Sequence, residues 1–203
     1  MSILPQSVSP FLVPFCFPFI LIARISNIVP FSKRSFDCCK HLCSGDIVPA
    51  PHGLTVTFKW SKTNQAGTRH LLLLLVAMPN SSLCPVKMFH RMCALIPASP
   101  MSPAFVLPSP DGSLSPVIKR QVVQVFRQRL LSDGVPHTHT YRGHSFRRGG
   151  ANWAFQCGVP RELIQVFGDW SSDTYKGYLE FSLPAKLRIA KCVTSVFMPS
   201  LSF

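Results

Sequence analysis

The stretch GHSFRRGGANWAFQCGVPRELIQVFGDWSSDTYKGY, residues 143–178, contains the pattern that decides the fold. Residues 145–156 predict a helix, and Gly158 ends it because glycine interrupts helical backbone. Pro160 and Gly168 bound a second predicted helix, since proline is favoured in the first turn of a helix and glycine just after its last turn. The stretch therefore predicts two successive helices that lead, through a turn, into a segment with two tyrosines.

Two basic side chains stand at the start of the first of these helices. His144 and Arg147 are three residues apart, so they lie on the same helical face. The free backbone N–H groups and the dipole of a helix N-terminus favour an anion at that end. Both side chains can therefore reach one phosphate, although a capped helix with a solvated basic end is the alternative that these residues alone leave open.

The order of the motifs in this stretch resembles the tyrosine recombinases, the family that includes the Xer, Cre and lambda integrase enzymes. In that family a His-x-x-Arg box is followed by a Gly-His or Gly-Trp box, and the nucleophilic tyrosine lies nine residues after that His or Trp. Tyr178 lies ten residues after Gly168 and thus nine after the His/Trp position that follows this glycine, so it has the family spacing. Tyr175 does not have it and is interpreted as a packing or DNA-contact residue. Asp169 occupies the usual His/Trp position, so Trp170 is expected to fill that slot, or Asp169 to orient a neighbouring donor.

The resemblance extends upstream and covers about residues 11–190. Ala23-Arg24-Ile25-Ser26 resembles the family's first arginine box, L-R-x-S/G-E, and Ser61-Lys62-Thr63 resembles the hairpin turn that holds the family's catalytic lysine. The sequences HSFRRGGANWAFQCGVP (144–160) and GDWSSDTYKGYL (168–179) most resemble those of recombinases of DIRS-type and Ngaro-type retrotransposons. The match therefore consists of several separately placed motifs in the family's order.

The resemblance implies an α+β fold, a mostly helical catalytic domain with a small antiparallel β-hairpin or sheet. It also implies DNA cleavage and rejoining through a 3′-phosphotyrosine, as in recombination and integration, without metal, ATP or other cofactor. Tyr178 would attack the phosphorus, and Arg24 and Arg147 would stabilise its non-bridging oxygens. Lys62 would protonate the leaving 5′-oxygen, and His144 would assist proton transfer or bind the same oxygens. The predicted catalytic set is Arg24, Lys62, His144, Arg147, Trp170 and Tyr178.

The charge of the chain favours a polyanionic partner. Lys and Arg number 21 against 8 Asp and Glu, which gives a net charge of +13. Double-stranded DNA is the expected partner because each cation near a phosphate releases a counterion, and an anionic membrane surface is the competing interpretation. The family resemblance adds self-association, as a tetramer on two duplexes. The residues expected to contact DNA are Lys59, Arg69, Lys119, Arg120, Arg127, Arg142 and Arg148.

The middle of the chain predicts a hairpin. Residues 54–60 alternate between apolar and polar side chains, which is typical of a strand with one buried face. Residues 68–76 predict a second strand, and the five leucines 71–75 suggest that it is covered on both faces. Lys62 is expected near the tip between the two strands.

The remaining segments predict two further helices, a long loop and a tail. Residues 86–96 have helical spacing, and residues 97–116 are rich in Pro and Ser, so we expect mostly loop there. Ser115 and Pro116 are suitable as the N-cap and first residue of a helix that runs to about Leu131. Residues 183–203 can form a C-terminal helix that either closes the core or reaches a neighbouring copy.

The apolar N-terminal segment from Pro10 to Ala23 is too short for a membrane span, which takes about 18–20 residues, and no basic segment precedes it as in a signal peptide. Its prolines recur every four residues, so it is either a buried, disrupted helix or no helix. We expect residues 1–203 to form one catalytic domain that lacks the family's N-terminal DNA-clamping domain. The expected location is the nucleus in a eukaryote or otherwise the cytoplasm, and not outside the cell.

The cysteine pattern favours unmodified thiols over a metal site. The eight cysteines contain no C-x-x-C pair. Cys38, Cys39, His41 and Cys43 are close together, but no second ligand pair follows at the distance found in zinc fingers. Buried or idle thiols in a reducing compartment are therefore preferred to zinc, and no metal is expected.

Two other functions compete with an active recombinase. Residues 146–168 also have the outline of a helix-turn-helix, which would make the chain a DNA-binding protein without catalysis. A decayed transposon remnant would keep the fold and lose the activity. A membrane-surface protein and a zinc protein are weaker alternatives. Trapping of a covalent DNA adduct distinguishes among them.

Overall fold

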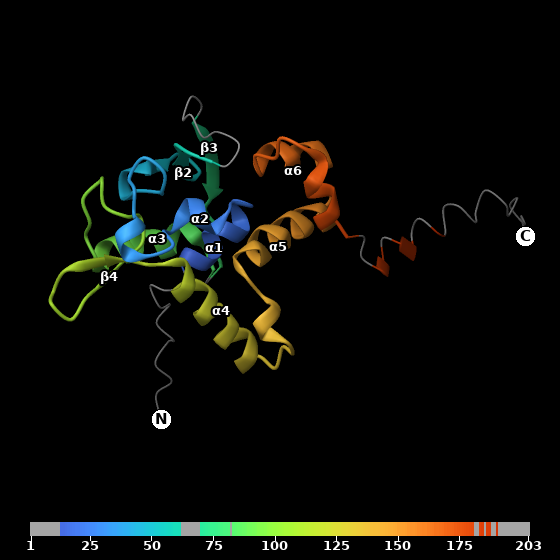
Figure 1. The fold of residues 1–203 in the computed structure, drawn as a ribbon. Helices are drawn as coiled ribbons and strands as arrows, with labels where there is room; N and C mark the ends of the chain where they lie inside the picture. Colours follow the sequence, from blue (N-terminus) through green and yellow to red (C-terminus); the bar gives the residue numbers. More distant parts are fainter. Residues whose placement is uncertain are drawn as a thin grey trace, which may run out of the picture.

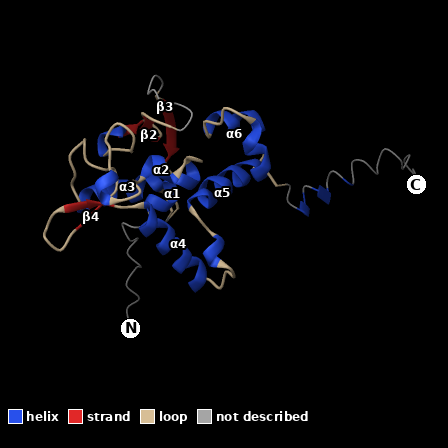
Figure 2. Ribbon diagram, in the orientation of Figure 1, coloured by secondary structure: helices blue, strands red, loops and turns tan. Residues whose placement is uncertain are grey.

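The computed structural model describes residues 13–61, 70–81 and 83–180, together with residues 183, 184, 186, 187 and 190. Helices predominate and the strands gather in two small sheets (Figures 1 and 2). The helices are α1 (Val13–Ile20), α2 (Ile25–Ile28), α3 (Pro85–Leu95), α4 (Lys119–Ser132), α5 (Gly143–Gln156) and α6 (Arg161–Phe167). The 3₁₀ helices are η2 (Lys33–Ser35), η3 (Ser44–Asp46), η4 (Thr138–Thr140) and η5 (Asp173–Tyr178). The α+β fold predicted from the sequence is confirmed.

Helix α1 settles the question that the N-terminal prolines left open. It is a helix despite Pro18 in its interior, and it contacts α3, α4 and α5. Phe17 and Leu21 are fully buried, and the ring of Phe17 packs edge-on against Phe105 at a centroid distance of 5.2 Å. Residues 13–23, the described part of the apolar N-terminal segment, therefore lie in the core, where tertiary packing outweighs the unfavourable helix propensity of Pro18.

The main sheet has the strand order β1-β2-β3, with β1 (Ile47–Ala50), β2 (Gly53–Phe58) and β3 (Leu71–Val76) all antiparallel. Leu54 and Val56 of β2 are buried and pair with Leu75 and Leu73 of β3. The predicted hairpin strands are thus confirmed in their described parts. The expectation that residues 71–75 are covered on both faces is wrong, since Leu72 and Leu74 are 60% and 55% exposed. Side chains alternate between the faces of a strand, and only one face of β3 packs against the core.

A second hairpin corrects the predicted start of α4. Strands β4 (Val106–Pro108) and β5 (Leu114–Pro116) pair within the segment expected to be loop. Ser115 and Pro116 therefore belong to a strand, and α4 begins at Lys119. The backbone N–H of Ile118 donates to Oε1 of Gln121 at 2.9 Å, so the glutamine satisfies one of the free donors at this helix start.

The other helix predictions are confirmed within a few residues: α3, α5 and α6 lie where the sequence places them. The predicted C-terminal helix lies mostly outside the described residues, and those of its residues that are described, among them Leu183 and Leu187, are helical and exposed. Within the described part of the chain, no helix has the length and apolar character needed to cross a membrane.

Helix α5 approaches the end of α1 closely because it contains glycines on that side. A Cβ atom at Gly150 would lie 2.1 Å from the backbone oxygen of Phe19, far inside contact distance. A Cβ atom at Gly143 would lie 2.5 Å from the Ile25 side chain at the start of α2. These two positions bring the turn between α1 and α2, which contains Arg24, against α5.

Gly150→Ala is therefore expected to lower the free energy of unfolding by about 2 kcal/mol, in the range for overpacked sites. Alanine favours the helix itself by up to about 1 kcal/mol, but the obstructing atom is backbone oxygen and cannot rotate away. Urea unfolding measures the change. Gly149→Ala is the matched control, because its Cβ would lie 3.1 Å from the movable ring of Phe19. Equal stability of the two variants would contradict the close approach.

Candidate active site

The turn after α6 has a backbone shape that only a few residues make possible. A Cβ atom at Gly168 would lie 1.8 Å from the Trp170 ring, so glycine is required for the ring to fold back over the helix end. Asp169 between them has a left-handed φ of 54°, and the backbone N–H of Trp170 donates to the Gln165 carbonyl at 3.1 Å. The Gly-Asp-Trp sequence thus places an aromatic ring beside α5 and a carboxylate on the turn.

Arg147 on α5 is buried in the centre of this region, with only 4% of its surface exposed. Its Nη1 donates to the carbonyl of Ile22 at 3.0 Å, and its Nη2 donates to the carbonyl of Gly168. The guanidinium carbon lies 3.7 Å from the centroid of the Trp170 ring, a cation–π distance. Arg147 therefore connects the end of α1, helix α5 and the end of α6.

The charge of Arg147 is influenced by three other candidate residues. Burial, and after it the positive charge of Arg24, lowers the pKa of Arg147 from its ordinary value to about 9. Tyr178 and Asp169 act in the opposite direction and favour the charged guanidinium. At neutral pH, below this pKa, Arg147 remains a cation, so the site keeps the charge that a phosphate would meet.

Arg24 follows the end of α1 and precedes the first residue of α2. It lines one small pocket with Asn27, Arg147 and Asp169, and a second pocket with His144 and Arg147. Arg24 is half-buried, and His144 is exposed on the first turn of α5. The structure thus brings the predicted Arg24, His144 and Arg147 together from segments more than a hundred residues apart in the sequence.

The two tyrosines differ in exposure. Tyr175 is 2% exposed and its ring lies 5.7 Å from Trp170, within a cluster that includes Ile22 and Ile164. Tyr178, the last residue of η5, is half-buried, and its ring lies 6.1 Å from the Trp170 ring. Tyr175 therefore fits the packing alternative, whereas Tyr178 is accessible from the surface beside Arg147.

The chain after Tyr178 is attached to α5. Arg148 forms an ion pair with Glu180 at 2.6 Å, and the backbone N–H of Glu180 donates to Oδ1 of Asn152 at 2.9 Å. Tyr178 lines a pocket with Arg148 and Asn152. Tyr178 therefore lies between the Trp170 ring and Glu180, which is bound to Arg148 and Asn152 of α5.

Lys62 and Arg69 lie outside the described residues, but the base of their hairpin is described. Nδ2 of Asn27 donates to the Trp60 carbonyl at 3.3 Å, and Oγ of Ser61 donates to Oδ2 of Asp169 at 2.7 Å. Both Asn27 and Ser61 are almost fully buried. The residue before Lys62 is therefore anchored to the turn that supports Arg147.

Sequence reasoning did not assign roles to Asn27 and Ser61. Asn27 stands where the pattern L-R-x-S/G-E has its glutamate, and this position in the motif could have marked it as a candidate. For Asp169, the signal was the acidic residue at a position usually taken by His or Trp. No comparable signal marked Ser61, because its partner is 108 residues away.

The predicted DNA contacts separate into two groups. Lys119, Arg120, Arg127 and Arg142 line a groove between α4 and the start of α5, and none of its described lining residues is acidic. Lys59, in contrast, forms an ion pair with Asp46 at 2.8 Å, and Arg148 pairs with Glu180. Arg127 also donates to the Tyr141 and His139 carbonyls, which fixes the edge of the groove.

Comparison with known proteins gives a match at the level of structure. No protein-family model and no curated protein matches the sequence. The structure is similar to the XerH site-specific recombinase bound to difH substrate in a pre-cleavage complex, with a TM-score of 0.59, 15% identity, and coverage of 98% of this chain and 50% of that one. It is also similar to XerH bound to palindromic difH substrate in a post-cleavage complex, with a TM-score of 0.62, 15% identity, and coverage of 95% and 48%.

The chain has the tyrosine-recombinase fold. It spans about half the length of the XerH chains that it matches. This match agrees with the mostly helical fold with a small antiparallel sheet that the motif order predicted. At this identity the match concerns the fold, and the chemistry rests on the side chains described above.

Proposed function

We propose that this chain cleaves and rejoins DNA strands through a covalent tyrosine–phosphate intermediate. The observation that supports the proposal is that Arg24 and Arg147 line common pockets, while Tyr178 lies beside the Trp170 ring that packs on Arg147. Ser61, at the base of the hairpin that leads to Lys62, is bonded to Asp169. These groups are brought together by the turn at Asp169. They come from four separate segments, and each has a chemical role in one reaction.

In the proposed reaction, Oη of Tyr178 gives up its proton, to His144 or to water, attacks a DNA phosphorus and becomes a 3′-phosphotyrosine. The bond to the 5′-oxygen breaks, and that oxygen takes a proton from Lys62. Arg24 and Arg147 stabilise the charge that develops on the non-bridging oxygens, and His144 assists at the same phosphate. Attack by a 5′-hydroxyl on the phosphotyrosine reverses these steps and reseals the strand, so the bond energy is conserved.

Double-stranded DNA is the substrate that the surface fits best. The basic groove of Lys119, Arg120 and Arg142 leads to His144 at the edge of the site, and basic residues in such a groove bind phosphates without reading bases. The similar XerH structures are complexes with difH DNA. We further propose a DIRS-type or Ngaro-type origin, assembly as a tetramer on two duplexes, and a nuclear location in a eukaryotic host.

A trapping experiment tests the proposal. The reduced chain is incubated with a pool of nicked suicide duplexes whose sequence is randomised around the nick, so that the released fragment diffuses away and cannot be rejoined. Covalent protein–DNA adduct that resists denaturation is the expected result, and peptide mapping identifies the linked residue. DNA binding without any adduct would refute cleavage and favour a non-catalytic DNA-binding protein.

Asp169 and Ser61 are expected to position Lys62. Ser61→Ala and Asp169→Ala should each lower the cleavage rate about tenfold, the equivalent of one lost hydrogen bond of about 1.4 kcal/mol. Asp169→Asn keeps an acceptor oxygen for Ser61 and should lose less. On a duplex with a 5′-bridging phosphorothiolate, whose sulfur leaves without a proton, both alanine variants should recover wild-type rates.

The matched control for this experiment is Ser171→Ala, an exposed serine just after the same turn, which should have no effect. If Asp169→Ala remains slow on the phosphorothiolate substrate, the carboxylate acts through the charge of Arg147 and not through Lys62. If Asp169→Asn lowers the cleavage rate as much as Asp169→Ala does, this would also indicate that the carboxylate acts through the charge of Arg147.

A further inference from the structure

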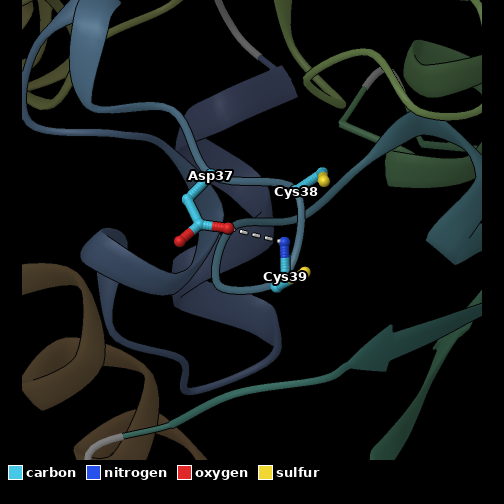
Figure 3. Close-up of side chains that lie close together, drawn as sticks. All are labelled: Asp37, Cys38 and Cys39. Atoms are coloured by element: carbon cyan, nitrogen blue, oxygen red, sulfur yellow. Dashed lines mark hydrogen bonds between the residues drawn. The ribbon is translucent and has the colours of Figure 1, made fainter.

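A cluster of thiol and carboxylate groups lies in the loop between η2 and η3 (Figure 3). The side-chain oxygen of Asp37 and the sulfur atoms of Cys38 and Cys39 all lie within 4.8 Å of one another. The cluster belongs neither to the pockets around Arg24 and Arg147 nor to the basic groove. The recombinase chemistry proposed above therefore does not use it.

The backbone of this loop is fixed by Asp37. Oδ1 of Asp37 accepts the backbone N–H of Cys39 at 2.9 Å (Figure 3), and the Asp37 carbonyl accepts the N–H groups of Lys40 and His41 at 3.0 and 2.8 Å. The backbone N–H of Asp37 itself donates to Nδ1 of His41 at 3.0 Å. The turn thus holds adjacent cysteines beside a carboxylate before any ligand binds.

The spacing of the three groups is close to that of ligands around one metal ion. Zinc–sulfur and zinc–oxygen bonds of about 2.0–2.3 Å in a tetrahedron place neighbouring donor atoms roughly 3.3–3.8 Å apart. Cys39 is exposed and Cys38 half-exposed, so their side chains can close the remaining distance by rotation.

The donor set selects the class of metal. Two thiolates with one carboxylate suit thiophilic or borderline ions such as Zn²⁺ and Cd²⁺, whereas Mg²⁺ and Ca²⁺ take oxygen ligands. We propose that Asp37, Cys38 and Cys39 bind one such divalent ion, with water in the fourth position. Cys43 is not part of this set, because it is 1% exposed and its sulfur lies 3.6 Å from Nζ of Lys59.

A bound ion would fix a loop that is joined to the core. Shortly after the cluster, the backbone N–H of Leu42 donates to the Asn27 carbonyl at 3.1 Å, and Asn27 is the residue that anchors the Lys62 hairpin. The ion would therefore stabilise the segment that supports α2. It contributes no step to DNA cleavage, so the two proposals fail independently.

Cadmium titration of the reduced full-length chain tests the site. We expect one high-affinity Cd²⁺ per chain and the ultraviolet charge-transfer absorption of two thiolates. Cys38→Ser and Cys39→Ser should each lower the affinity at least about tenfold and remove about half of that absorption. Asp37→Asn should lower the affinity and keep the absorption. Cys157→Ser, at an exposed cysteine elsewhere, is the matched control and should change neither.

Alkylation of the wild-type chain gives an independent measurement that does not depend on folding of the variants. With Zn²⁺ or Cd²⁺ bound, Cys38 and Cys39 should be protected from iodoacetamide while Cys157 still reacts, as peptide mass mapping shows. Absence of the charge-transfer absorption in the wild type, its persistence in the double Cys38→Ser, Cys39→Ser variant, or protection at other cysteines only would each overturn the proposal.

Discussion

Tyr178→Phe is expected to abolish the covalent protein–DNA adduct completely, because the phenol oxygen that we propose as the nucleophile is gone. The phenyl ring remains, so its packing against Trp170 at 6.1 Å and the fold are expected to persist. DNA binding should change less than twofold, since it rests on charges spread over the surface. The measurement is adduct yield on the nicked suicide duplexes, with binding measured in parallel.

Tyr175→Phe is the matched control for the nucleophile. It removes the same hydroxyl group from a residue that is 2% exposed and lies in the core, so adduct formation should remain. Adduct in Tyr178→Phe together with its loss in Tyr175→Phe would move the nucleophile to Tyr175 and shift the register of the site. Adduct in both single variants would contradict Tyr178 as the sole nucleophile, and adduct in the double variant would exclude both tyrosines.

Arg147→Ala should remove cleavage and also lower the free energy of unfolding by about 3 kcal/mol. The buried carbonyls of Ile22 and Gly168 each lose a donor, at about 1–3 kcal/mol apiece. Removing a charge that is expensive to bury offsets part of this loss. Cleavage should fall at least about 10²–10³-fold, as for a lost oxyanion donor. Urea unfolding and adduct yield measure the two effects.

Arg24→Ala separates these two roles. Arg24 is half-buried, so the variant should lose cleavage to a similar extent while its stability changes by less than about 1 kcal/mol. Arg147→Lys keeps the charge but cannot donate to both carbonyls in the same planar arrangement, so it should remain destabilised. An Arg147→Ala variant as stable as the wild type would show that the two carbonyls find other donors.

Much of the fold could be predicted from local sequence signals. Gly158, Pro160 and Gly168 mark the limits of α5 and α6, and the alternation in residues 54–60 marks β2. The incorrect predictions concern segments whose conformation or burial depends on a partner outside the segment itself. An apolar run such as residues 71–75 does not indicate whether one or both faces of the strand are buried. Pro116 is typical of a helix start, but it pairs with Val106 in a β-hairpin, and this pairing is not evident from the local sequence.

The candidate site shows the same division. The motif order indicated the types of residue that meet there, and the structure brings Arg24, His144 and Arg147 together. Sequence could not reveal that Arg147 is buried and bonded to two carbonyls, because neither Ile22 nor Gly168 contributes a recognisable side-chain signal. The contact between Ser61 and Asp169 was equally hidden, since it joins segments that no local pattern relates.

The left-handed backbone conformation of Ile22 and Asp169 costs conformational free energy at this site. Non-glycine residues in that region are strained by about 1–2 kcal/mol, more so when β-branched. The carbonyls that Arg147 binds belong to Ile22 itself and to the residue just before Asp169, so one guanidinium holds both strained turns in place. Any movement of Arg147 toward a substrate phosphate would release that strain. Under the proposed function, phosphate binding that shifts Arg147 would therefore be thermodynamically linked to the shape of the two turns.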